Sequence, residues 1–418
     1  MSKFISTKAA GQLQTSLIIC NLCRGANNIC RFVLCRMRKA IISINTKQVS
    51  KIKTMMKINL LKQTKRKTKN AWLSQVLLLT LASGLTACQM TQHEPVTVEH
   101  QPIRVINNSV EIYSAEAEQF LSTDTPLQVL SEGYKWTEGP LWVADTSLAS
   151  QGYLLFSDIP NNKIYQYIPG QGTALYLQPS GATGLVDGDY GQGSNGLLLN
   201  QQNQLVLMQQ GDRRVAVMQS ALSAPQPKFK TLAGYYQGKR LNSPNDAVYD
   251  SQGNLYFTDP PYGLAKILQD ERKALDFQGV YRLSNQGQLT LLDDEITFPN
   301  GIGLSPDGKT LYVAVSDINN PVWYAYDVAN NGQVTNKRVF FDAKQPNQKP
   351  HGLPDGMAVH SNGTLFATGP DGVWLFNPKG QVIAKVKTGK LTANCTLAEN
   401  EKALYLSAHD TLMRIPLK

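Results

Sequence analysis

The chain has 418 residues, 17% of them charged, and a formal net charge of +10. The first 87 residues hold 16 of the 41 Lys and Arg and none of the 31 Asp and Glu, so residues 88–418 carry 25 basic and 31 acidic residues, a net charge of −6. Because the basic character belongs to the N-terminal segment alone, it gives no argument for nucleic-acid binding, and we expect no nucleic-acid partner.

The segment from Met55 to Ala87 has the pattern of a secretory signal. A cationic stretch precedes a short apolar run, Ala71 to Leu85, which is shorter than the roughly 20 residues of a membrane span. It ends in Leu-Thr-Ala followed by Cys88, which resembles the lipoprotein box of bacterial lipoproteins. That resemblance implies a signal peptide over residues 55–87, a lipidated Cys88, and a location in the bacterial cell envelope, at the outer membrane or the periplasmic face. The competing interpretation is an uncleaved hydrophobic tail.

Residues 1–54 do not fit in front of such a signal, and we interpret them as an upstream misannotation with the true start at Met55 or Met56. Four of the six Cys lie there, without the second half that a zinc site needs. Residues 88–125 are polar and are predicted as a tether from the membrane to the domain. Cys395 is expected to be a small buried hydrophobic residue.

From residue 126 to 418 the sequence repeats a short apolar strand, a turn rich in Asp, Gly or Asn, and a second apolar strand. The first strands begin at six leucines: Leu154, Leu205, Leu255, Leu311, Leu365 and Leu404. Repeats of roughly 40–50 residues built only from strands are typical of a β-propeller with one four-stranded blade per repeat. The sequence therefore predicts an all-β fold, one six-bladed β-propeller with a metal site in its central channel. The segment from Asp259 to Gln278 interrupts the third repeat and, because it begins with two prolines, is predicted as a loop.

Four segments that precede predicted inner strands carry a carboxylate or an amide beside Gly or Pro. The four polar residues are Glu138, Asn245, Asn300 and Asp355. Segments that enter the innermost strands of a propeller meet at the channel mouth, so these side chains are expected to converge. Two carboxylates and two amide carbonyls form an oxygen-only site that suits one divalent cation, Ca²⁺ first, with Mg²⁺, Mn²⁺ or Zn²⁺ as alternatives. Taken singly, each segment is equally well explained as an ordinary turn.

These motifs resemble the gluconolactonase, senescence-marker-protein-30 and luciferin-regenerating-enzyme family of six-bladed propellers, and bacterial gluconolactonases most. The resemblance covers about residues 132–416. It is carried by four segments: Arg240 to Asp246, Tyr256 to Gly263, Phe298 to Gly301 and Gly352 to Met357.

The resemblance implies that Glu138, Asn300 and Asp355 bind the cation, that Asn245 contacts the cation or the substrate, and that Asp355 also transfers a proton. Animal members place a sugar-binding Arg where this chain has Ser243, and Arg240 is the nearby alternative. We also expect Tyr262 and His351 to contact substrate. Asp158, Asn195 and Arg214 are further candidates for the rim.

The expected reaction is hydrolysis of a sugar lactone, similar to glucono-lactone, to its aldonic acid. The cation would polarise the carbonyl, and either Asp355 or a hydroxide on the cation would serve as the base or nucleophile. No Gly-x-Ser-x-Gly motif supports a serine hydrolase. Two alternatives stay open: another lactone or organophosphate ester as substrate, favoured by an aromatic mouth, and a non-catalytic binding propeller. We expect a monomer that meets the membrane only through Cys88.

Overall fold

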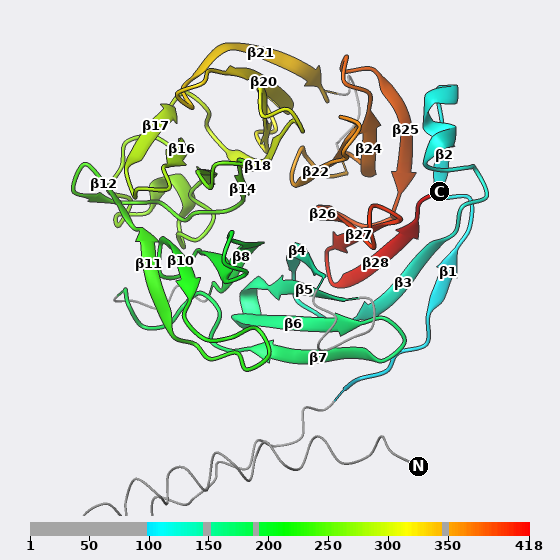
Figure 1. Cartoon of the computed structure of the whole chain (residues 1–418), viewed down its shortest axis with the longest axis horizontal. Coiled ribbons are helices and arrows are strands. Elements are labelled where there is room, and N and C mark those ends of the chain that lie inside the picture. The colour runs from blue at the N-terminus through cyan, green and yellow to red at the C-terminus, as the bar shows by residue number, and fades with distance from the viewer. Residues whose placement is uncertain (1–97, 145–151, 187–191, 345–350) are drawn as a thin grey trace, which may run out of the picture. The chain divides into compact units, whose positions relative to one another are not determined.

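A computed structural model of the chain describes residues 98–144, 152–186, 192–344 and 351–418. The described residues form six sheets of four or five strands and one two-stranded hairpin. The six sheets are arranged in a ring, and each sheet turns one edge strand, its inner strand, toward the centre (Figure 1). The predicted all-β six-bladed propeller is therefore confirmed.

The first four blades follow the chain in order, and each is a meander of antiparallel strands. The first holds β4 (Thr137–Val143), β5 (Tyr153–Asp158), β6 (Lys163–Ile168) and β7 (Gly172–Leu177). The second holds β8 (Ser194–Leu199), β9 (Leu205–Gln209), β10 (Arg214–Met218) and β11 (Phe229–Ala233). The third holds β14 (Ala247–Tyr249), β15 (Leu255–Asp259), β16 (Gly279–Leu283) and β17 (Leu289–Asp293). The fourth holds β18 (Pro299–Leu304), β19 (Thr310–Val315), β20 (Val322–Val328) and β21 (Val334–Asp342).

The last two blades take strands from the N-terminal side of the domain. The fifth holds β22 (Met357–Val359), β23 (Leu365–Gly369), β24 (Gly372–Phe376) and β25 (Val382–Lys387), with β2 (Val110–Ile112) outside β25. The sixth holds β26 (Thr392–Ala398), β27 (Ala403–Ala408) and β28 (Thr411–Pro416), followed by β3 (Leu127–Glu132) and β1 (Arg104–Ile106). Pairing of β28 with β3 joins the two ends of the domain and closes the ring.

Part of the predicted tether belongs to the propeller. The strands β1 and β2 pair with β3 and β25, and the 3-10 helix η1 (Ala115–Gln119) contributes buried Ala117 to the core beside the fifth and sixth blades. The tether prediction is thus corrected for residues 104–119. The polar composition concealed these strands because each spans only three residues, of which only Val110 is buried.

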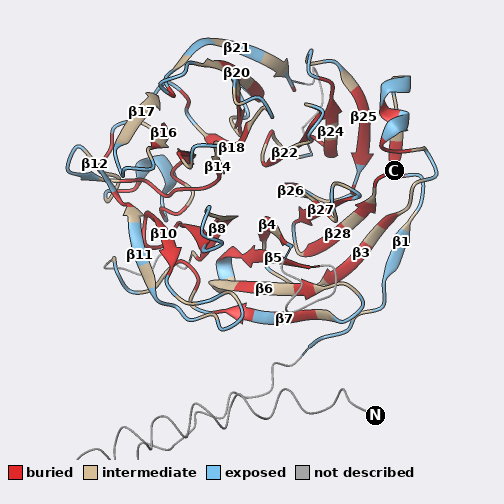
Figure 2. Cartoon of the chain, viewed as in Figure 1, coloured by how far each residue is buried: buried red, intermediate tan, exposed pale blue. Residues whose placement is uncertain are grey.

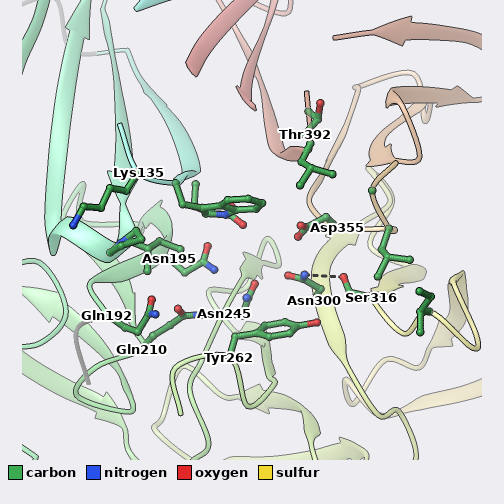
Figure 3. Close-up of a pocket in the computed structure, with 18 residues that line it drawn as sticks. Lys135, Gln192, Asn195, Gln210, Asn245, Tyr262, Asn300, Ser316, Asp355 and Thr392 are labelled. Atoms are coloured by element: carbon green, nitrogen blue, oxygen red, sulfur yellow. Dashed lines mark hydrogen bonds between the residues drawn. The ribbon is translucent and has the colours of Figure 1, made fainter. Parts of the chain in front are cut away.

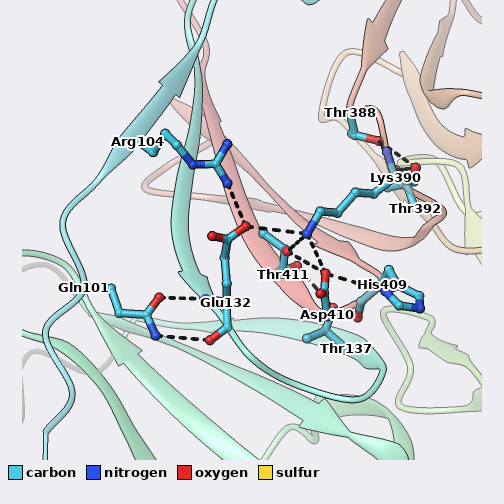
Figure 4. Close-up of polar contacts among 10 residues, drawn as sticks. All are labelled: Gln101, Arg104, Glu132, Thr137, Thr388, Lys390, Thr392, His409, Asp410 and Thr411. Carbon is cyan, nitrogen blue, oxygen red and sulfur yellow. Dashed lines mark hydrogen bonds and ion pairs between the residues drawn. The ribbon is translucent and has the colours of Figure 1, made fainter.

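Ion pairs reinforce the ring closure (Figure 4). The Lys390 ammonium, on the loop before β26, lies 2.5 Å from a carboxylate oxygen of Asp410 and 3.5 Å from one of Glu132 at the end of β3. Arg104 of β1 pairs with the same Glu132 carboxylate at 2.7 Å. The network therefore links strands from both ends of the domain.

The core lies between neighbouring blades. One cluster joins Val206 and Met208 of β9 with Leu255 and Phe257 of β15. The second strand from the centre of each blade is buried over nearly its whole length, whereas the outer strands range from the largely buried β7 and β25 to β21, which has no buried residue (Figure 2). Burial on both faces explains why the second strands read as continuous apolar runs in the sequence. The second strands of all six blades contain the six leucines that mark the first strand of each sequence repeat. The structure therefore confirms the predicted positions of these strands.

The remaining elements are short connections. The 3-10 helix η2 (Ile159–Asn161) follows β5, the hairpin β12 (Tyr235–Tyr236) and β13 (Lys239–Arg240) follows β11, and η3 (Ile267–Gln269) lies in the predicted long loop between β15 and β16. Cys395 is buried, as predicted. The predicted signal peptide, Cys88 and residues 1–54 lie outside the described residues. No helix within the described ranges is long and apolar enough to cross a membrane.

Candidate active site

A cavity of about 670 Å³ occupies one end of the channel. Polar residues from five successive blades line it: Glu138, Asn195, Asn245, Asn300 and Asp355. Each lies at the start of an inner strand or at most two residues before it. Figure 3 shows Asn195, Asn245, Asn300 and Asp355 pointing toward a common centre. The structure thus brings together all four residues predicted to hold a cation, and adds Asn195.

Glycines beside these residues allow the inner strands to approach so closely. A Cβ on Gly139 would lie 2.2 Å from the Asn195 carbonyl oxygen, and one on Gly301 would lie 2.1 Å from that of Asp355. Gly139 also has a φ of +51°, a conformation that side-chain-bearing residues rarely adopt. The Gly next to a polar residue in the sequence therefore has a packing role, because it sets the distance between one site residue and the next.

Hydroxyl groups hold the backbone of the site in place. Ser157 donates to the Asn195 carbonyl at 2.8 Å, Thr258 to that of Asn300 at 2.6 Å, and Ser316 to that of Pro354 at 2.6 Å. The Asn300 side-chain amide donates to the Ser316 hydroxyl at 2.8 Å (Figure 3), which leaves its carbonyl oxygen available to the cavity. Such supporting contacts orient the groups that bind a ligand or an ion.

Three carboxyl groups are buried at the channel without a basic partner. Glu138, Asp246 and Asp355 form no ion pair with any Lys, Arg or His of the described residues. Burial raises the pKa of Glu138, and the neighbouring charge of Asp246 raises it further. Burial, followed by the charges of Glu138 and Asp246, raises the pKa of Asp355 well above its ordinary value. Uncompensated buried carboxylates are costly, so this arrangement favours a bound cation.

The donor set fits such a cation. The side-chain oxygen Oδ1 of Asn195 and Oδ1 of Asp355 are both buried without a hydrogen-bond partner. Carboxylate and amide oxygens are the ligands that Ca²⁺ and Mg²⁺ prefer. Within the described part of the chain, no three His, Cys, Asp or Glu side chains are grouped closely enough to hold a metal by themselves. A cation at this site would therefore depend on the amide oxygens of Asn195, Asn245 and Asn300.

Tyr262 reaches the cavity from the loop between β15 and β16, as expected for a substrate contact. Its ring stacks on Phe298 at 5.8 Å. Ser243 fixes the loop, because its hydroxyl donates to the Pro260 carbonyl at 2.5 Å and accepts from the Gly263 amide at 2.8 Å. Ser243 stands where the resembled family's animal members have a sugar-binding Arg. In this chain it supports the loop backbone instead, since Ser243 is fully buried and does not line the cavity.

Two other predicted substrate contacts do not line the cavity. The Arg240 guanidinium lies on β13, where it donates to the Asp212 carbonyl and the Tyr235 hydroxyl. His351 is exposed, 4.0 Å from a carboxylate oxygen of Asp371. The structure therefore places neither beside Asp355. Among the rim candidates, Arg214 forms a buried ion pair with Asp212.

Asp158 supports the rim from below. Its carboxylate accepts from the backbone amides of Lys135 and Trp136, two residues that line the cavity. Gln192 and Gln210 line it too and were not predicted. Asn195 could have been assigned to the cation set from sequence, because Ser194-Asn195-Gly196 repeats the pattern of an amide beside Gly before an inner strand.

The chain is similar to characterised proteins over most of the propeller. The family model described as SMP-30/Gluconolactonase/LRE-like region matches residues 136–410. A gluconolactonase of Zymomonas mobilis is 33% identical over 312 residues, which cover 73% of this chain and 85% of that protein. The lactonohydrolase oryL of Aspergillus oryzae is 27% identical over 42% of this chain and 44% of its own. The solved structure of a gluconolactonase from Xanthomonas campestris superposes with a TM-score of 0.64 at 27% identity, covering 78% of this chain and all of that one.

Proposed function

Because the chain belongs to the SMP-30/gluconolactonase/LRE-like family and is a lactone hydrolase of that family, we propose that it opens a sugar lactone to its aldonic acid with the help of one divalent cation. The observation that carries the metal dependence is the convergence of Glu138 and Asp355, without a basic partner, on three amide side chains. We propose Ca²⁺ as the ion, because the site is built from oxygen ligands alone.

Glu138, Asn195, Asn245, Asn300 and Asp355 would hold the cation. When bound, a divalent ion there supplies electrophilic polarisation of the lactone carbonyl. The chain's own residues position the ring against it: Tyr262 closes one side of the cavity, and Gln192 and Gln210 offer polar groups on another. The side-chain nitrogen of Gln210 is buried without a partner, so it can donate to a substrate oxygen.

Hydrolysis requires one water and two proton movements. The water oxygen bonds to the carbonyl carbon, the ring C–O bond breaks, and the ring oxygen takes a proton to become the hydroxyl of the open acid. We assign Asp355 to accept the proton from water, because its carboxylate lines the cavity beside the other proposed cation ligands. The same carboxyl can return that proton to the leaving oxygen, as a positioned acid–base group does.

The test is proton release from glucono-δ-lactone by the purified protein, measured as isolated, after EDTA treatment, and after return of Ca²⁺. We expect EDTA to abolish activity and Ca²⁺ to restore it. Asp355→Asn should lower kcat by roughly 10²–10⁴-fold. After EDTA treatment, metal analysis shows whether the protein is free of divalent ions. A folded, metal-free protein that still hydrolyses the lactone at the original rate would overturn the metal dependence. No hydrolysis with any divalent ion would overturn the proposed function.

A further inference from the structure

The volume of the cavity is large enough for a ligand bigger than a single sugar ring. The side chains on its two sides differ in chemistry. Cavities of roughly 300–1,000 Å³ take ligands of drug size, and this one has about 670 Å³. Lys135, Gln192 and Gln210 lie on the side that bears Asn195, whereas Thr392 and Ser316 lie across the cavity beside Asp355 (Figure 3). The first side can hydrogen-bond a hydroxylated ring.

Apolar side chains from three successive blades line the same cavity. Ile318 comes from the loop between β19 and β20, Leu353 from the segment before β22, and Leu391 from the residue before β26. Ile318 is 66% exposed and Leu391 37% exposed. A single exposed apolar residue is ordinary on a protein surface. Among the described residues, three from separate loops at one cavity offer a ligand an apolar contact surface.

Hydrogen bonds hold these apolar residues in place. The Ser316 hydroxyl donates to the Pro354 carbonyl, which ties the loop of Ile318 to the segment of Leu353. A methyl carbon of Leu391 lies 3.8 Å from the position that a Cβ on Gly352 would take, so Leu391 lies against the residue next to Leu353. The surface formed by Ile318, Leu353 and Leu391, the apolar wall, therefore has Leu391 against Gly352, the neighbour of Leu353, and is linked to the loop of Ile318 through Ser316.

The loop of Leu391 is fixed on its other side by the network of Figure 4. The Lys390 ammonium contacts Asp410 and donates to the Thr411 hydroxyl, and the Thr388 hydroxyl lies 2.7 Å from that of Thr392. An apolar surface that is ordered before binding loses little side-chain entropy when a ligand covers it. The wall is therefore suited to hold a flexible apolar group.

We infer that the site takes lactones whose ring bears an apolar alkyl substituent, with the ring at the carboxylate and amide cluster and the substituent along the apolar wall. This inference rests on the proposed lactone hydrolysis and adds the substrate class. Each methylene that the wall covers should raise kcat/KM about fourfold, the factor that corresponds to burying one CH₂ group.

The experiment measures kcat/KM for glucono-δ-lactone, δ-valerolactone, δ-octalactone and δ-decalactone with the cation-loaded protein. We expect kcat/KM to rise from δ-valerolactone to δ-octalactone and δ-decalactone by about fourfold per methylene until the wall is covered. In Ile318→Asn and Leu391→Asn the ratio of δ-decalactone to δ-valerolactone should fall by roughly tenfold. Leu391→Trp, which fills the wall instead of making it polar, should shift the preference toward the shorter chain.

Val339→Asn is the matched control, because Val339 is 54% exposed on the outer strand β21 and distant in the blade from the inner strand β18. That variant should keep the wild-type ratio. Hydrolysis of all four lactones without a rise along the alkyl series would overturn this inference and leave the proposed function intact. Failure to hydrolyse any lactone, glucono-δ-lactone included, would overturn both.

Discussion

At the scale of single residues, the site is a cluster of buried carboxyl groups that have no cationic partner among the described residues. Glu138 is 3% exposed, and its carboxylate accepts from the Gly139 amide at 3.0 Å but pairs with no cationic side chain in the described ranges. Asp355 and Asp246 share this environment. Such a cluster stores unfavourable electrostatic energy in the absence of a cation and releases it on binding, so cation affinity and protein stability are coupled.

The variant Glu138→Gln tests this coupling by a measurement that does not depend on activity. The amide keeps the shape of the side chain but removes one buried charge, so the cation-free variant should be more stable than the cation-free wild type by about 1–3 kcal/mol. Added Ca²⁺ should raise the melting temperature of the wild type and leave that of the variant nearly unchanged. Calorimetry with and without EDTA measures both the stability difference between the cation-free proteins and the change in melting temperature on adding Ca²⁺.

Glu271→Gln is the control, because Glu271 is an exposed partner of Lys266 and such pairs contribute little to stability. It should behave as wild type in both conditions. A Ca²⁺-induced shift in Glu138→Gln as large as that of the wild type would show that Glu138 does not belong to the cation site.

Sequence patterns predicted the centre of the site better than its rim. Glu138, Asn245, Asn300 and Asp355 converge as predicted, because their positions follow from the blade repeat. Arg240 and His351 were assigned from their nearness in sequence to Asn245 and Asp355, and neither lines the cavity in the structure. Rim residues lie on loops whose course depends on tertiary contacts, such as those of Ser243, and no periodic pattern encodes them.

At the scale of elements, the second and third strands of each blade and the start of several inner strands were predictable from the sequence, whereas the outer strands were not. The second strands β5, β9 and β15 are buried throughout, so their apolar runs stand out. The nine residues of β21 include no buried residue, and its pattern of exposure does not alternate regularly. Outer strands are held by backbone pairing, which leaves little trace in side-chain composition.

The approach of β4 to β8 depends on Gly139, which gives a prediction at this scale. Gly139→Ala should destabilise the protein by more than about 2 kcal/mol, since its Cβ would overlap the Asn195 carbonyl oxygen and its φ is +51°. Gly308→Ala is the control: it has a φ of +70° but no atom within 4 Å of the added Cβ, so it should cost only about 1–2 kcal/mol. Urea unfolding measures both. Equal losses would show that the close approach does not matter.

At the scale of the whole molecule, stability depends on ring closure between β3 and β28. Asp410, in the turn before β28, accepts from the Lys390 ammonium, and this contact lowers the pKa of Asp410 to about 2. A carboxyl whose pKa is lowered in the folded state stabilises the protein above its unfolded pKa, near 3.8, and this contribution disappears as the pH falls toward 2.

Lys390→Met should therefore lower the free energy of unfolding at pH 7, by no more than about 1 kcal/mol because the pair is partly exposed. The difference from wild type should shrink between pH 4 and pH 2, which denaturant titrations at several pH values would measure. Lys266→Met, which removes an exposed pair on the surface loop, is the control and should show a smaller difference. A Lys390→Met difference that stayed constant down to pH 2 would exclude the ionic contribution.

We propose above all that oxygen atoms from five successive blades hold one divalent cation at the channel mouth. A crystal structure of the Ca²⁺-loaded protein tests it most directly. We expect one cation with carboxylate oxygens of Glu138 and Asp355, and amide oxygens from Asn195, Asn245 and Asn300, among its ligands at roughly 2.3–2.6 Å. A cavity that contains only water in Ca²⁺-saturated crystals, or a cation bound away from Asp355, would contradict it.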